Sequence, residues 1–172
     1  MNTTLILLSL LELGIALLLS VFVLYLTFLV MQRLIVRRYD IEKDNIAFAV
    51  LGAAMLFSVG NILEGIVAPV SSTIRQLRDV HDHVATIAGQ AFLYILLFFV
   101  ISFFIALLIN WLSIQLYISL THFDEFEEIR QNNIAIGILT GVIMIVISMF
   151  VKEAIIQVME SLVPYPRLPN IR

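Results

Sequence analysis

The sequence predicts an all-α integral membrane protein with four transmembrane helices, built from two parallel two-helix repeats. Of its 172 residues 61% are hydrophobic, only 13% are charged, and the mean hydropathy is +1.04, whereas a soluble domain is about half apolar. The charged residues cluster between long apolar runs, which is typical of a polytopic membrane protein. A third observation predicts the repeat: residues 39–47, YDIEKDNIA, recur 88 positions later as residues 127–135, EEIRQNNIA.

The first two helices are expected in residues 1–69, the first repeat. The apolar run Leu5–Met31 exceeds the roughly 20 residues that cross a bilayer, and it lacks the basic start of a signal peptide. We therefore expect it to be retained as a span. The second span is expected from about Asn45 to Val67, and Pro69 should end it because proline cannot continue a helix without loss of a hydrogen bond.

The second half repeats this plan after a polar connection at residues 70–89, whose one-sided apolar pattern predicts a short interfacial helix. Residues 90–163 form the second repeat, with an uncharged span from about residue 90 to 120 and a final span from about Asn133 to Leu162. Residues 164–172 contain three prolines and should be an extended tail.

Small residues mark one face of the second and fourth helices. At 100° per residue the members on each helix fall within about 60° of one direction, and the two sets match after the 88-residue shift. Small side chains let helices approach closely in lipid. The prediction is that these faces meet near an axis along the membrane normal, with a seam between copies of the chain as the alternative. The set is Ala49, Gly52, Ala53, Gly60, Gly137, Thr140, Gly141 and Ser148.

Intramembrane polar residues are few and therefore informative. Glu64 and Lys152 occupy equivalent positions and could pair across the repeat axis, although Glu153 could neutralise Lys152 instead and both charges could reach the headgroups. Glu12, Asn110 and Gln115 are the other intramembrane polar groups; hydrogen bonding to a neighbouring helix or ion ligation would each account for Asn110 and Gln115.

The connections offer little chemistry. Asp124, Glu125, Glu127 and Glu128 form either a partner surface or a solvated acidic face. The sequence 81–83, HDH, is better explained as a solvated loop than as a metal site. Cysteine is absent, and no nucleotide-binding loop, hydrolase serine motif or catalytic carboxylate pair occurs, so we expect no enzyme, metal or cofactor. The net charge of −3 is too small and scattered to indicate nucleic acid.

Orientation follows from the basic cluster that adjoins the first span. Arg33, Arg37 and Arg38 favour a cytoplasmic location for the duplicated stretches. An even number of spans then places both termini outside the cytoplasm.

The two repeat openings carry a family resemblance. The matching positions are Ile41, Asn45, Ala47 and Gly52 in one copy and Ile129, Asn133, Ala135, Gly137 and Gly141 in the other. This pattern resembles the YjfL-like bacterial inner-membrane family, a domain-of-unknown-function family with a duplicated two-helix repeat. The resemblance implies a bacterial inner (cytoplasmic) membrane location and a transport-like label, and it supplies no catalytic residues.

Two functions remain after these exclusions. One is a non-enzymatic structural subunit whose spans pack in the lipid bilayer against copies of themselves or other membrane subunits. The other is a transporter or channel component with a polar path near the repeat axis. Four spans with so few polar positions make a poor solitary pathway, which favours the subunit.

Overall fold

The computed structural model describes residue 17 and residues 20–42, 44–80, 84–121 and 125–163, and these residues form helices joined by short turns. The first helix covers Ser20–Tyr39 and ends in the π-helical segment η1 (Gln32–Val36) and in α2 (Arg37–Tyr39). The others are α3 (Ile46–Glu64), α4 (Val67–Val80), α5 (Val84–Thr121), α6 (Glu125–Arg130) and α7 (Ile134–Ser161). The predicted all-α class is confirmed.

Four of the described helical stretches are long and apolar enough to cross a membrane, as predicted. They cover Ser20–Tyr39, Ile46–Leu77, Gly89–Thr121 and Ile134–Ser161. Their outer surfaces carry large exposed apolar side chains, of which Phe150 is 82% exposed. Such a surface is stable in lipid and not in water. The protein is therefore a multi-pass membrane protein.

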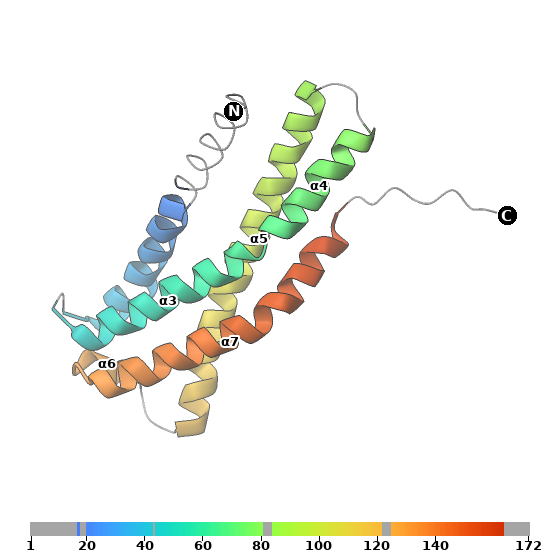
Figure 1. Ribbon diagram of the computed structural model, residues 1–172. Coiled ribbons are helices and arrows are strands. Elements are labelled where there is room, and N and C mark those ends of the chain that lie inside the picture. Colours follow the sequence, from blue (N-terminus) through green and yellow to red (C-terminus); the bar gives the residue numbers. More distant parts are fainter. Residues whose placement is uncertain (1–16, 18–19, 43, 81–83, 122–124, 164–172) are drawn as a thin grey trace, which may run out of the picture.

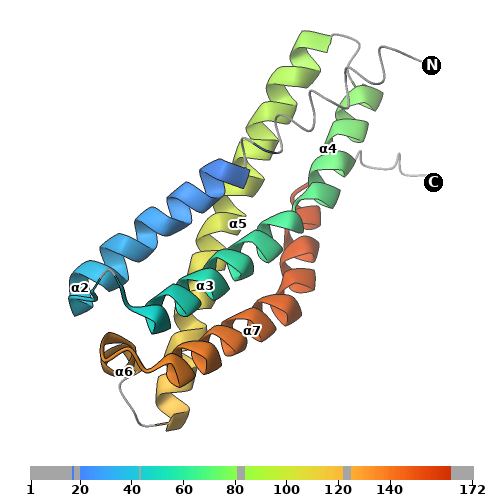
Figure 2. The same ribbon diagram turned by 60° about the vertical axis from the view of Figure 1, so that its left-hand side comes forward.

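The centre of the fold is the pair α3 and α7, which run side by side in the same direction (Figure 1). The long helix α5 crosses this pair, and the first helix lies beside α3 and α5 (Figure 2). Two apolar clusters fill the interior. One joins Met31, Leu51, Ile114 and Met144 near α6, and the other joins residues that include Val59, Phe98 and Met159 toward the opposite end.

Helices α3 and α7 begin with the same kind of N-cap. Asn45 and Asn133 precede the two helices in extended conformation, and the Oδ1 of each accepts a hydrogen bond from the amide three residues later. Asparagine is a preferred N-cap because its side chain satisfies an amide that has no partner inside the helix. The repeated Asn-Ile-Ala triplets thus mark two helix starts.

The prediction that Pro69 ends the second span is wrong. The helix direction changes earlier, at the tight turn of Gly65 and Ile66, and Pro69 lies in the first turn of α4. Proline is tolerated there because the first amides of a helix have no intrahelical acceptor. Helix α4 covers much of the predicted polar connection and packs against α5 and α7 rather than standing alone.

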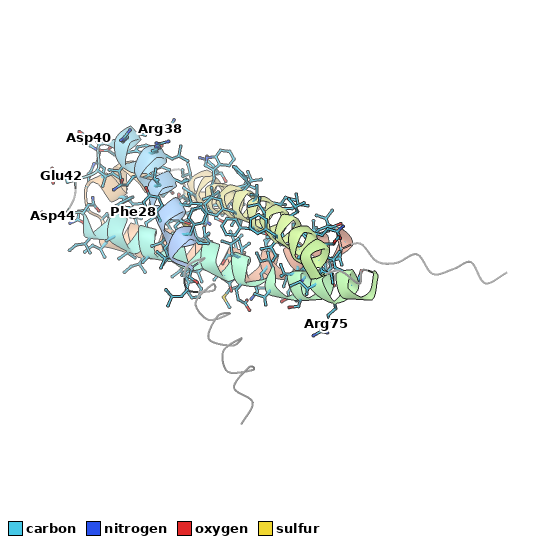
Figure 3. The ribbon with its side chains drawn as sticks, turned by 90° about the horizontal axis from the view of Figure 1, so that it is seen from above. Phe28, Arg38, Asp40, Glu42, Asp44 and Arg75 are labelled. Atoms are coloured by element: carbon cyan, nitrogen blue, oxygen red, sulfur yellow. The ribbon has the colours of Figure 1, made fainter. Side chains whose placement is uncertain are left out.

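The basic cluster is part of a helix and does not lie in a loop. Arg33, Arg37 and Arg38 lie within the helical stretch that continues to Tyr39, beyond the predicted span end at Met31. Seen from above, Arg38, Asp40, Glu42 and Asp44 gather at one end of the molecule and Arg75 lies toward the other (Figure 3).

Candidate functional site

Helices α7 and α3 come into very close contact at two glycines of α7. A Cβ atom added to Gly137 would lie 2.6 Å from the carbonyl oxygen of Ala47 and 3.0 Å from its Cα, and one added to Gly141 would lie 2.8 Å from Ala54 Cβ. Only glycine allows backbones this near. The α3–α7 contact, called the seam below, is therefore closed to side chains at Gly137 and Gly141.

The eight small residues of the predicted packing face do not all lie at the contact between α3 and α7. On α7, Gly137, Thr140, Gly141 and Ser148 are all buried. On α3, Gly52 is buried against Met31 of the first helix, and Ala47 and Ala54 make the contact with α7. The remaining three, Ala49, Ala53 and Gly60, are exposed on the outer face of α3, and a Cβ atom at Gly60 would meet no atom within 4 Å.

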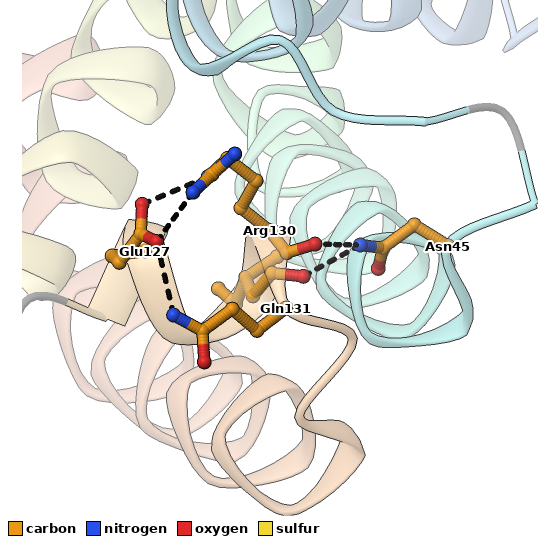
Figure 4. A network of polar contacts seen from close by, with 5 residues as sticks. Asn45, Glu127, Arg130 and Gln131 are labelled. Carbon is orange, nitrogen blue, oxygen red and sulfur yellow. Dashed lines mark hydrogen bonds and ion pairs between the residues drawn. The ribbon is translucent and has the colours of Figure 1, made fainter.

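A polar junction joins the start of α3 to the segment before α7. The Nδ2 of Asn45 donates to the carbonyl oxygens of Ile129 (2.6 Å) and Arg130 (3.2 Å), as Figure 4 shows. In return, Asn132 Oδ1 accepts the amide of Ala47 at 3.0 Å. Asn132 has a φ of 61°, in the left-handed region, where asparagine is among the best-tolerated residues. Two asparagines thus fasten the two halves at this end.

The acidic connection is partly incorporated in this junction. Glu127 accepts hydrogen bonds from Arg130 and Gln131 (Figure 4), and the bond with Arg130 holds its pKa down to about 2. Glu128 accepts from Asn133 Nδ2 at 2.8 Å. Glu125 is buried and accepts from the Thr121 hydroxyl. Asp124 lies outside the described residues.

The opposite end of the α3–α7 seam carries an ion pair. Lys152 Nζ donates to Glu64 Oε2, and the two residues are 88 apart in sequence. The Lys152 side chain is 22% exposed and that of Glu64 is 67% exposed. Glu153, the competing partner considered for Lys152, is exposed. The pair therefore lies at the molecular surface.

A charge exchange should test this pair. Exposed ion pairs contribute about 0–1 kcal/mol, and a like-charge pair costs a similar amount. We expect Lys152→Glu to lower the melting temperature in detergent by roughly 2–4 °C, since each kcal/mol corresponds to that shift for a chain of this size. Glu64→Lys combined with Lys152→Glu should restore most of the loss. Glu153→Lys is the matched control and should change little; additive losses in the double variant would contradict the pairing.

The other predicted polar residues have different surroundings. Asn110 is fully buried; its Nδ2 donates to the Ala106 carbonyl at 2.8 Å, and its Oδ1 has no partner among the described residues. Gln115 is exposed. Glu12 and the sequence 81–83 lie outside the described residues.

A pocket of about 420 Å³ brings Asn110 and Gln115 together with the basic cluster. It lies between the first helix and α5, and Met55 of α3 and Phe126 of α6 complete its wall. Arg33, Arg38 and Trp111 also line it. Sequence reasoning did not find this pocket, because its two sides come from helices that are some 75 residues apart and the π-helical turn on one side has no recognised sequence signature.

Comparison with known protein families shows which family the chain belongs to. The family described as Domain of Unknown Function (DUF350) matches residues 4–155, which is most of the sequence. The chain belongs to the DUF350 family. No curated protein and no solved structure matches it. The features of this DUF350 protein that bear on its function are the seam, the outer face of α3 and the pocket.

Proposed function

We propose that this DUF350 protein is a non-enzymatic structural subunit of an oligomeric membrane complex, and that a second membrane chain packs on the outer face of α3. The supporting observation is the row Ala49, Ala53 and Gly60. These three residues lie on one side of the helix, and all are exposed in the single chain. Small residues four apart are a common contact between membrane helices, since they let a second backbone approach.

The internal geometry supports a subunit better than a pathway. Because Gly137 places α7 against the backbone of Ala47, no room for an ion remains at that point of the seam. The proposal also takes the two halves as parallel copies of one two-helix unit. Its support is that Asn45 and Asn133 both cap helices and that Glu64 and Lys152 are partners, each pair being 88 residues apart.

Membrane and orientation belong to the same proposal. The YjfL-like pattern at the two helix starts favours a bacterial inner membrane. The exposed arginines Arg33, Arg37 and Arg38 lie at the same end of the molecule as α6, because Tyr39 of α2 stacks on Phe126 of α6 at 4.4 Å. Basic residues favour the cytoplasmic side. We place this end in the cytoplasm and both termini outside it.

A transporter or channel component is the second candidate. The observation in its favour is a set of fully buried hydroxyl groups, Ser58, Ser102 and Thr140, which have no hydrogen-bond partner among the described residues. Unpaired buried hydroxyls are costly in lipid and can bind water or ions. They lie on three different helices, α3, α5 and α7, but the seam beside them is closed.

Cysteine cross-linking tests the subunit proposal, because the chain contains no cysteine. In native membranes Ala53→Cys should form disulfide-linked dimers on mild oxidation. Phe150→Cys, on the exposed side of α7, is the matched control and should remain monomeric. If the partner is a different chain, a diazirine attached to the same cysteine should capture one discrete membrane protein. Neither product at position 53, or equal dimer formation at both sites, would refute the proposal.

A further inference from the structure

The pocket between the first helix and α5 owes its charge to the π-helical turn η1. The amide of Arg37 bonds the carbonyl oxygen of Gln32, so this bond spans five residues. In a regular α-helix, residues five apart point about 140° away from each other. In a π-turn they lie nearly one above the other. Arg33 and Arg38, five residues apart, accordingly both line the pocket, and the intervening Arg37 does not.

These two arginines are available to a ligand. Both are exposed, and no carboxylate of the described residues forms an ion pair with either. Arg38 lies over the ring of Tyr39, with its guanidinium carbon 5.7 Å from the ring centre, and Tyr39 is itself stacked on Phe126. A stacked guanidinium keeps its planar donors directed along the ring and free for an anion. The mouth of the pocket therefore favours a negatively charged group.

The remainder of the pocket is apolar. Its walls include Val30 and Leu34 on the first helix and Leu107 and Ile114 on α5. A volume of about 420 Å³ is in the range of small-molecule sites, roughly 300–1,000 Å³. A ligand that fits must combine an anion with an apolar chain.

We infer that this pocket binds an anionic glycerophospholipid. Its phosphate lies between Arg33 and Arg38, and the beginning of one acyl chain lies between the first helix and α5. Basic pockets between transmembrane helices are a recurrent form of headgroup site. Phosphatidylglycerol meets both requirements, since it carries an anionic phosphate and two acyl chains. This inference does not depend on the proposed function.

The protein contains its own reporter for this site. Trp111 lines the pocket and is the single tryptophan of the chain. Phospholipids with brominated acyl chains quench tryptophan fluorescence on contact. In vesicles of phosphatidylcholine, brominated phosphatidylglycerol should reach half-maximal quenching at a mole fraction roughly tenfold lower than brominated phosphatidylcholine, because two arginines contribute to the preference. Excess unbrominated phosphatidylglycerol should relieve that quenching.

Matched variants separate the pocket from general surface charge. Arg33→Gln with Arg38→Gln should remove the preference, so that both lipids quench at the same mole fraction. Arg37→Gln removes a neighbouring charge that does not line the pocket and should retain the preference. Equal quenching by both lipids in the wild-type protein, or a preference that survives the double substitution, would overturn the inference. The displacement by unbrominated lipid uses the wild-type chain alone and so does not depend on how a variant folds.

Discussion

Gly137→Leu is expected to be the most damaging single substitution in the described part of the chain. Even the first atom of a side chain at this position would lie 2.6 Å from the Ala47 carbonyl oxygen, and backbone cannot rotate away as a side chain can. Overpacking a tight contact costs about 1–3 kcal/mol, and a leucine against backbone should reach or exceed the upper end. We expect the melting temperature in detergent to fall by roughly 6–12 °C.

Gly60→Leu is the matched control for this substitution. Gly60 is also a helical glycine in a membrane span, but a Cβ atom there would meet nothing within 4 Å. A glycine-to-leucine change at an open helical position should be neutral or slightly favourable for the isolated chain, because leucine has the higher helix propensity. Equal losses at positions 60 and 137 would show that the α3–α7 seam is not as close as described.

The second large effect is expected at Asn45. Asn45→Ala removes the N-cap of α3, worth about 1 kcal/mol, and two hydrogen bonds between the halves. The Arg130 carbonyl loses the Asn45 donor, and the Ile129 carbonyl keeps only the Asn132 amide, at 2.9 Å. Each of these two hydrogen bonds contributes about 0.5–1.5 kcal/mol. We therefore expect a total loss of roughly 2–4 kcal/mol, measured by thermal or denaturant unfolding in detergent micelles.

Two further variants divide this loss into its parts. Asn45→Ser retains an oxygen that can cap the Phe48 amide but supplies no donor that reaches both carbonyl groups, so it should recover only the capping share. Asn133→Ala removes a weaker cap, in which the Oδ1 is 3.5 Å from the Ile136 amide, and one bond to the nearby Glu128. A smaller loss is expected there. If the alanine variants at 45 and 133 were equally unstable, the bonds between the halves would contribute nothing.

Much of the fold could be predicted because hydropathy and length determine membrane spans. Four apolar runs gave four helices, and the paired asparagines that open the second and fourth spans are helix caps in the structure. The long-range role of Asn45 could not be predicted, since a cap signature involves only residues within the first turn. Its partners at 129 and 130 depend on how α6 packs against the start of α3.

The rotation of α3 about its own axis could not be predicted from the sequence either. In a soluble helix the polar face points outward, but in lipid both faces are apolar and give no such signal. Ala47 and Ala54 face α7 whereas Ala49 and Ala53 face outward, although all four are alanines. On α7, Gly137, Thr140, Gly141 and Ser148 do all lie inward. Gly52 faces the first helix instead, where Met31 occupies the space beside it.

The bonds that fasten α3 have a consequence for biosynthesis. Asn45 and Ala47 find their partners 84 or 85 residues further along the chain, and Glu64 finds its partner 88 residues later. At about 5–20 residues per second, a ribosome needs roughly 4–17 s to supply those partners. During this interval the nascent first half lies in the bilayer with its α7-facing side uncovered. We expect chains that stop after α5 to be preferred substrates of membrane proteases, because their second span lacks both its bonds to residues 129–132 and its neighbour α7.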